Sequence, residues 1–148
     1  MVVIKKAVDH DLPEIAALLE LVNLSVEGVD DHFRDFLVAY EGYHLVGCIG
    51  IEIYDNVGLI RSVAVHHMFQ GHGLGRELVR RMEHISIDKG LERLYLITET
   101  ARRFFSLLGY VTIPRDTVDA KVKQSIEYTK VCSASGICMM KNLKQNLI

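Results

Sequence analysis

Hydrophobic positions recur along the chain with two periods, and these periods predict alternating strands and helices. Alternation or a short apolar run predicts seven strands, at residues 2–8, 36–40, 44–54, 57–65, 93–97, 110–113 and 137–140. Spacings of three and four residues predict helices that begin near Asp11 and at Leu74, one that ends at Gly109, and one over 117–131. The polar stretch 23–35 is expected to form a loop with a short helix. This order of elements predicts a mixed α/β fold.

Two of the predicted helices carry further local signals. Asp11 is a candidate N-cap, Pro13 suits the first turn, and Glu14 completes a pair similar to a capping box. In the helix that begins at Leu74 the apolar residues share one face, and the charged residues, Glu83 among them, are expected to point mostly outward. Both helices are therefore expected to pack one side against a core.

The strands at 44–54 and 57–65 carry charged residues among apolar neighbours. One face of the first strand holds Leu45, Ile49, Ile51 and Ile53, and its other face holds His44, Val46, Cys48, Glu52 and Tyr54. Glu52 is therefore expected on a polar side. The second strand carries Arg61 in its middle, and a lone arginine inside an apolar strand needs a partner.

Length and composition are those of an ordinary globular protein. The 148 residues predict a single domain, 1–148, with 49% hydrophobic and 24% charged residues. A net charge of −2 shows no nucleic-acid footprint, and no apolar run approaches the ~20 residues of a membrane span. The first residues lack a signal-peptide layout. Three cysteines, an odd number, argue against a disulfide framework and predict a reducing, cytoplasmic location.

The stretch 63–76 combines an apolar strand, three glycines within five residues, and the start of a helix. Glycines let a backbone approach a ligand closely, and the first helical N–H groups lack partners within the helix. The helix dipole adds positive charge there, so the stretch predicts a phosphate site. Arg76 stands where a Rossmann turn needs glycine, and Gly75 is not followed by the Lys-Ser/Thr of a P-loop. The pattern that remains is Gln70-x-x-Gly73-x-Gly75.

This pattern resembles the Q/R-x-x-G-x-G/A loop of the GNAT family of acetyl-CoA-dependent N-acetyltransferases. Residues 63–66 and 104–110 also match the family pattern, and the resemblance spans essentially the whole chain. It implies a central sheet of about seven strands, splayed between the fourth and fifth strands and flanked by helices. It also implies an enzyme that transfers an acetyl group from acetyl-CoA to an amine.

A closer resemblance concerns residues 94–105, which are similar to acetyltransferases encoded in arsenic-resistance operons and to the acetyltransferase domain of N-acetylglutamate synthases. The tail 132–143 looks most like the arsenic-operon type. That subgroup implies a small amino-acid-like amine as acceptor, such as a toxic glutamate analogue. Two alternatives stay open: an acceptor amine on a protein or peptide, and a non-catalytic sensor that binds acyl-CoA.

The resemblance also assigns the cofactor site. Backbone amides of the glycine loop would hold the pyrophosphate, and these belong to Gln70, Gly71, His72, Gly73, Leu74, Gly75 and Arg76. The pantetheine arm would pair with the strand edge at Val63 and Val65, where an amide could polarise the thioester carbonyl. Thr98 stands where many members carry an asparagine that contacts this arm. Phe105 stands where many carry the tyrosine that protonates the departing thiolate. Three accounts stay open: water donates the proton, a hydroxyl such as that of Tyr128 or Thr100 donates it, or the chain is not an enzyme.

Two residues are candidates for the base that deprotonates the amine. Glu52 could act directly or through water, or it could be a solvated strand residue. His66 is a candidate because histidine is the usual general base near neutral pH, or it only shapes the turn that it begins. For Arg61 the alternatives are a substrate carboxylate, phosphinate or arsonate, held by two parallel hydrogen bonds, and an internal salt bridge to Glu52. Thr100 is a further candidate for the substrate site.

Cys132 and Cys138 invite a comparison with soft-metal sites, since thiolates bind trivalent arsenic. Their spacing matches no standard zinc motif, and buried structural cysteines are the commoner case. We therefore predict no metal. The expected partner is a small-molecule amine, without nucleic acid or membrane. The oligomeric state stays open, with a homodimer as one option.

Overall fold

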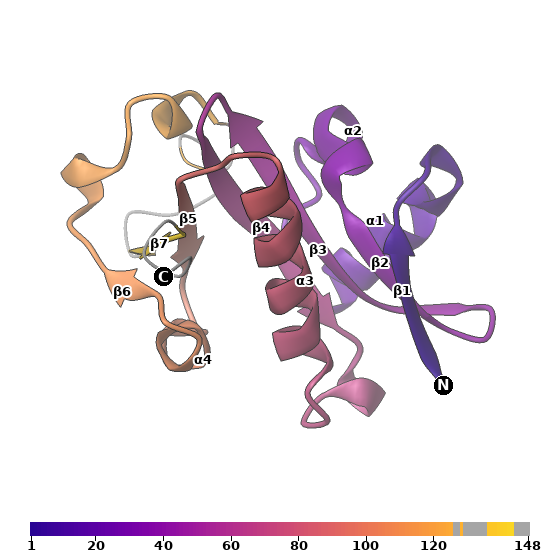
Figure 1. Ribbon diagram of the computed structural model, residues 1–148. Coiled ribbons are helices and arrows are strands. Elements are labelled where there is room, and N and C mark those ends of the chain that lie inside the picture. The colour runs from indigo at the N-terminus through magenta and orange to yellow at the C-terminus, as the bar shows by residue number, and fades with distance from the viewer. Residues whose placement is uncertain (126–127, 129–135, 144–148) are drawn as a thin grey trace. The chain divides into compact units, whose positions relative to one another are not determined.

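The computed structural model describes residues 1–125, 128 and 136–143, which form a seven-stranded mixed sheet flanked by helices (Figure 1). Its strands are β1 (Val2–Lys6), β2 (Leu37–Glu41), β3 (His44–Tyr54), β4 (Val57–Val65), β5 (Arg93–Thr98), β6 (Val111–Thr112) and β7 (Ile137–Asn142). They lie in the order β1-β2-β3-β4-β5-β7-β6. The predicted α/β class and the number of strands are confirmed.

Strand direction changes from one pair to the next. β1, β2 and β3 pair antiparallel in sequence order. A short turn joins β2 to β3, whereas the longer segment 7–36, which contains helices, joins β1 to β2. β4 and β5 pair parallel, with Val57 opposite Arg93 and Leu59 opposite Tyr95, and the long connection between them contains a helix. β7 then lies antiparallel to both β5 and β6.

The helices are α1 (Leu12–Leu21), α2 (Val29–His32), α3 (Leu74–Asp88) and α4 (Arg102–Leu107). Short 3-10 turns cover Asp9–Asp11, Phe33–Asp35, His67–Phe69, Arg115–Thr117 and Val122–Gln124. The predicted start at Leu74 is confirmed, and so is the short helix within 23–35. Gly109 follows the end of α4 with a positive φ of 99°, as expected of a residue that ends a helix.

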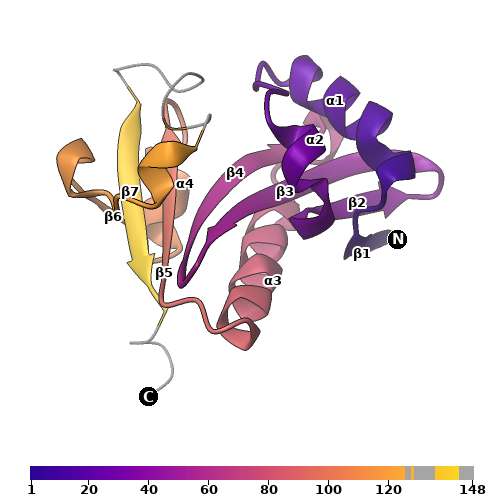
Figure 2. The ribbon, with the colours of Figure 1, turned by 90° about the horizontal axis from the view of Figure 1, so that it is seen from above.

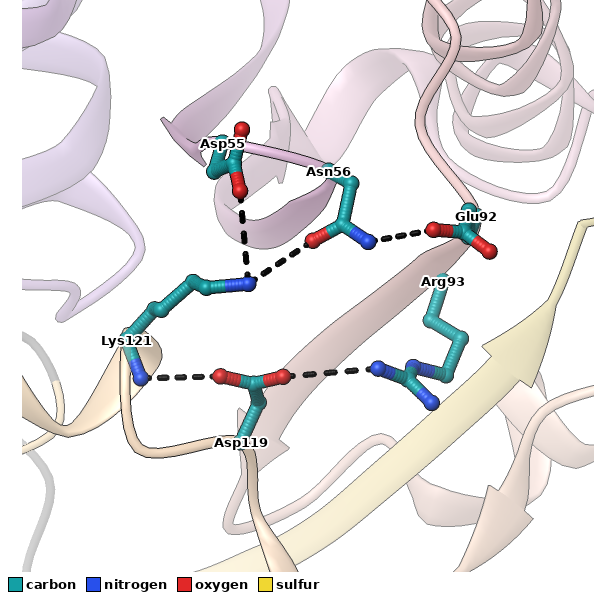
Figure 3. A network of polar contacts seen from close by, with 6 residues as sticks. All are labelled: Asp55, Asn56, Glu92, Arg93, Asp119 and Lys121. Atoms are coloured by element: carbon teal, nitrogen blue, oxygen red, sulfur yellow. Dashed lines mark hydrogen bonds and ion pairs between the residues drawn. The ribbon is translucent and has the colours of Figure 1, made fainter.

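A helix is predicted over 117–131, and for residues 117–125, which the structure describes, this prediction is wrong. Val118 is extended, at φ −62° and ψ 139°, and Asp119 accepts a hydrogen bond from the Lys121 amide at 2.9 Å. Such a local contact from an aspartate competes with helical hydrogen bonding. Asp119 and Lys121 also join a polar network with Asp55, Asn56, Glu92 and Arg93 (Figure 3). The remainder of that prediction, apart from Tyr128, lies outside the described residues, as does Cys132.

The chain divides into two compact units, each with its own core. The first unit comprises Met1–Ile51 with Ser62–Met82, and the second comprises Glu52–Arg61 with Glu83–Ile148. In the first unit α1 and α2 lie over one face of the sheet, and α3 lies on the other face (Figure 2). The core of the second unit gathers buried residues that include Val57, Leu59 and Tyr95. The expectation of a single domain over 1–148 stays a prediction.

The expectation that one face of β3 is polar is wrong, because helices or aromatic side chains cover both of its faces. Residues 46–52 are buried, and Glu52 is only 1% exposed. A Cβ at Gly47 would contact Leu74 and Leu78 of α3, whereas the next residue, Cys48, packs in the cluster that contains α1 residues. A strand covered on both sides buries every residue whatever its alternation.

Two further local expectations are corrected by contacts that are distant in the sequence. The Asp11 side chain makes no capping bond to α1; it accepts hydrogen bonds from the Val8 amide at 2.8 Å and the Tyr40 hydroxyl at 2.6 Å. Glu83 is 6% exposed rather than outward, because Lys141 and Tyr110 both donate hydrogen bonds to it. The position of each carboxylate is set by hydrogen-bond donors that helix periodicity does not reveal.

Candidate active site

The segment between β4 and α3 folds as the predicted strand, glycine turn and helix. Gly71 and Gly73 adopt positive φ angles of 81° and 86°, which glycine reaches without strain. The amide of Glu77 donates to the Gly73 carbonyl at 3.0 Å, which is a helical i to i−4 bond. The amides of Leu74 to Arg76 precede it and belong to the orphan N–H groups of a helix start. They provide donors for an anion at this turn.

Side chains hold the first part of this loop against the end of β4. The Gln70 side-chain amide donates to the Val65 carbonyl at 2.9 Å. The His66 backbone N–H donates to the Val46 carbonyl at 2.8 Å, and its ring Nδ1 accepts from the Met68 amide at 3.1 Å. His66 therefore caps the turn His67–Phe69. His72 and Arg76 are exposed at the glycine turn, and Leu74 and Gly75 are half-buried.

Ser62 is a feature of β4 that sequence reasoning missed. Its φ is +57°, a left-handed conformation that costs a non-glycine residue energy and often marks a bulge or a functional site. The Cys48 thiol donates to its carbonyl at 3.3 Å. The irregular backbone comes directly before Val63 and Val65, both half-buried on β4. A serine inside an apolar strand carries no sequence signal for this conformation.

A buried polar cluster surrounds Glu52 in the second unit. Arg61 Nη1 lies 2.8 Å from Glu52 Oε2, and the two side chains are 0% and 1% exposed. The other oxygen, Oε1, accepts from the hydroxyls of Tyr54 and Ser125, each at 2.5 Å. Burial, and then the hydrogen bond to Glu52, raise the pKa of Tyr54 to about 12, so its phenol keeps its proton at neutral pH.

Of the two alternatives that the sequence left open for Arg61, the internal salt bridge to Glu52 is present in the structure. Ser125 lies 73 residues away from Glu52 along the chain, so no sequence spacing predicts their contact. Tyr54 shares a strand face with Glu52, and that alternation could have suggested its contact with the carboxylate.

The remaining predicted residues lie around the start of α4. The Thr98 hydroxyl oxygen accepts from the Ala101 amide at 2.9 Å and so shapes the turn that leads into the helix. Thr100 is exposed. Phe105 is 5% exposed and packs edge-on against Phe104 and Tyr110, with ring centroids 5.0 Å and 5.7 Å away. Thr98, Thr100 and Phe105 belong to the second unit, as do Glu52 and Arg61. The first unit contains Val63, Val65, His66 and the glycine loop.

Two classes of feature are not found in the part of the chain that the structure describes. None of its helices is long and apolar enough to cross a membrane. No group of three or more histidine, cysteine or acidic residues there is placed to hold a metal ion, and the thiol of Cys138 is buried.

Comparison with known proteins identifies the family of this chain. The model of the acetyltransferase (GNAT) family matches residues 8–110, well over half of the chain, and the match includes the glycine loop. The chain belongs to the GNAT family. An uncharacterised N-acetyltransferase of Chlorobaculum tepidum is 32% identical over 126 residues, which cover 83% of this chain and 80% of that protein. The predictions of a GNAT protein and of an acetyltransferase that acts on an amine are confirmed.

Other relatives are more distant. An amino-acid acetyltransferase of Mycobacterium tuberculosis is 29% identical over 131 residues, covering 81% of this chain and 74% of that protein. The structure of N-acetylglutamate synthase from Neisseria gonorrhoeae, complexed with coenzyme A and N-acetyl-glutamate, has a TM-score of 0.82 at 22% identity. This alignment covers 97% of the GNAT chain but only 35% of the synthase. A Mycobacterium tuberculosis protein in complex with CoA has a TM-score of 0.80 at 24% identity, over 95% and 98% of the two chains. At these identities the structural matches show the shared fold.

Proposed function

We propose that this GNAT protein transfers an acetyl group from acetyl-CoA to a small amine that resembles an amino acid. The observation that carries the proposal is the glycine loop, whose amides lie at the start of α3 next to a strand with an irregular backbone. The likeness to an amino-acid acetyltransferase supports an amino-acid-like acceptor. The sequence favours a finer proposal, in which the protein belongs to the arsenic-operon subgroup and its acceptor is a toxic glutamate analogue.

In this proposal acetyl-CoA supplies the activated acetyl group, and the loop binds its pyrophosphate. Seven residues would offer backbone amides or line the site: Gln70, Gly71, His72, Gly73, Leu74, Gly75 and Arg76. The positive φ angles of Gly71 and Gly73 support this role, because a side chain at either position would strain the turn. The left-handed Ser62 breaks the regular path of β4 before Val63 and Val65, which supports a role for their backbone in orienting the pantetheine arm.

Glu52 is the better of the two candidates for the base. The His66 Nδ1 lone pair already accepts a hydrogen bond, so the neutral ring carries its proton on Nε2 and has no free lone pair. Glu52 is buried, but the half-buried Tyr54 donates to it. We propose that Tyr54 accepts a proton from the ammonium group while it passes its own proton to Glu52. His66 then acts by shaping the loop.

The experiment that tests the proposed function has a binding arm and a turnover arm. Acetyl-CoA is expected to bind the purified protein at micromolar Kd, roughly −8 kcal/mol. Gly73→Asp should abolish this binding, because it adds a side chain and a negative charge at the pyrophosphate site. Gly42→Asp is the matched control, since Gly42 also has a positive φ, of 59°, but lies in the β2–β3 turn. Isothermal calorimetry measures both variants.

The turnover arm follows the release of free CoA thiol with a panel of amines that includes glutamate and glutamate analogues. An amino-acid-like amine should give the highest kcat/KM, and basic peptides should give little. Unchanged binding of acetyl-CoA by a folded Gly73→Asp protein would remove the basis of the proposal. A preference for peptide amines would overturn its acceptor.

A further inference from the structure

A cavity of about 360 Å³ lies within the first unit. Its walls come from one side of α1, the end of β2, the start of β3 and the turn that follows β4. Of the proposed site residues only His66 lines it. Its size falls within the range of small-molecule sites in proteins.

The cavity has an apolar floor and a polar rim. Leu18 and Val46 are 4% and 3% exposed and form the floor, with half-buried Phe69 beside them. At the rim, Glu14 is exposed and Glu41 is half-buried. This arrangement suits a ligand with an apolar body and a polar end that stays close to water.

The charge at the rim favours a cation. The lining includes two carboxylates, Glu14 and Glu41, and two histidines, His44 and His66, but no lysine or arginine. Glu41 already pairs with the amino group of Met1 at 3.0 Å, so Glu14 is the carboxylate with more capacity for a ligand. A metal ion is disfavoured, since the described residues contain no cluster of three metal-binding side chains.

Glu14 is held in place but is not saturated. The Tyr40 hydroxyl lies 2.9 Å from Glu14 Oε2 and 2.6 Å from Asp11 Oδ1. A phenol has one proton and can donate it to only one of the two carboxylates at a time. Burial and these carboxylates raise the pKa of Tyr40 above its ordinary value, so the phenol keeps that proton. Glu14 therefore retains lone pairs for a further donor.

We propose that this cavity binds a small primary ammonium compound with an apolar body, at a site separate from that of the acetyl acceptor. The apolar body packs on Leu18, Val46 and Phe69, and the ammonium group lies beside Glu14 at the rim. Because the charge stays near solvent, binding buries carbon without the full cost of desolvating an ion.

The direct test is calorimetric titration with primary n-alkylamines from propyl to octyl, with the alcohols of the same lengths as uncharged partners. No acetyl-CoA is present. Each added methylene should tighten binding about fourfold until the chain outgrows the cavity. Each amine should bind more tightly than its alcohol. Absence of binding, or equal binding of amines and alcohols, would overturn the proposal.

Variants place the binding in this cavity. Glu14→Gln should weaken amine binding about two- to fivefold, as expected for an exposed ion pair, and leave the alcohols unchanged. Glu20→Gln is the matched control, because Glu20 is also exposed on α1 but does not line the cavity. Ala17→Trp, which fills the cavity from its exposed edge, should abolish binding of both series. Ala17→Leu, a smaller change, should weaken both if the tryptophan variant does not fold.

A product assay separates this site from the acceptor site. With acetyl-CoA added, the alkylamine should be recovered unacetylated, and Ala17→Trp should leave turnover of the best acceptor unchanged. Acetylation of the alkylamine that Ala17→Trp abolishes would overturn the separation of the two sites. Because the binding titrations contain no acetyl-CoA, their failure would not affect the proposed acetyl transfer.

Discussion

At the scale of single residues, Glu52 and Arg61 are charged groups without access to solvent, at 1% and 0% side-chain exposure. Their burial removes the hydration of two charges, and the ion pair with added hydrogen bonds offsets that loss. The hydroxyls of Tyr54 and Ser125 supply such bonds to the carboxylate. Removing one charge should therefore harm the protein more than removing both.

The first prediction tests this pair. Arg61→Met should lower the free energy of unfolding by about 3–5 kcal/mol, because it leaves the Glu52 charge buried without its cation. Adding Glu52→Gln to Arg61→Met should recover a large part of the loss. Urea denaturation measures both variants.

The control for this pair is Arg81→Met. Arg81 pairs with Glu77 at 3.0 Å, but both side chains are 52% exposed, so the change should cost no more than about 1 kcal/mol. A stable Arg61→Met protein with a selectively raised KM for anionic amines would instead favour a substrate contact for Arg61.

The second prediction concerns Phe105, where the resemblance implies a tyrosine. Phe105→Tyr should keep its activity and shift the alkaline limb of the pH–rate profile, because a phenol with an ordinary pKa near ~10 adds a proton donor. The wild-type enzyme should be active without it, since general acid help is typically worth 10²–10⁴-fold and thiolates are tolerable leaving groups.

Phe104→Tyr is the control for this change, because Phe104 is the neighbouring half-buried ring. Profiles of kcat against pH decide the outcome. A Phe105→Tyr profile identical to that of wild type would show that the new hydroxyl does not reach the reacting atoms.

At the scale of elements, glycines set how closely β3 is covered. A Cβ at Gly50 would lie 2.2 Å from the Phe36 ring. A Cβ at Gly47 would lie 3.2 Å from the end of the Leu74 side chain, which has more freedom to move. The Phe36 ring is fully buried, so the two positions should respond differently to the same added methyl group.

The third prediction compares these two glycines. Gly50→Ala should lower the free energy of unfolding by about 1–3 kcal/mol, the usual cost of overpacking, because the ring must shift. Gly47→Ala should cost less, since a leucine methyl can give way. Urea denaturation of the two variants measures the difference. Equal stabilities would mean that Phe36 has room to move.

At the scale of the whole molecule, the proposed ligand should change the stability of the fold. A ligand that binds only the native state adds about 2.7 kcal/mol at one hundred times its Kd. For a chain of this length that corresponds to a rise in Tm of roughly 5–10 °C.

The fourth prediction follows from that linkage. Saturating acetyl-CoA should raise the Tm of the wild-type protein by this amount, and Gly73→Asp should show no rise. Gly42→Asp should show the wild-type response. Differential scanning calorimetry with and without acetyl-CoA checks all three proteins. A rise in the Gly73→Asp protein would place the ligand somewhere other than the glycine loop.

Most elements were predictable from the sequence because their signals are local. The apolar periods predict all seven strands and the start of α3 at Leu74. The glycine spacing predicts a turn before the helix, and in that turn Gly71 and Gly73 adopt positive φ. Over the described residues 117–125 the predicted helix is absent, because Asp119 and its partners compete with helical bonding in a segment whose apolar spacing alone favours a helix.

The sequence by itself thus determined the family, the strand–turn–helix unit and the residues of the glycine loop, because these depend on short-range sterics and spacing. Only the tertiary structure decided the partner of Arg61, the contact of Ser125 with Glu52, the left-handed Ser62 and the cavity beside α1. The Ser125 contact and the cavity bring together groups that are far apart in the chain, and the Arg61 pair depends on how two neighbouring strands align. A buried carboxylate such as Glu52 or Asp11 accepts hydrogen bonds from the donors that lie within reach, and the folded structure determines which donors those are.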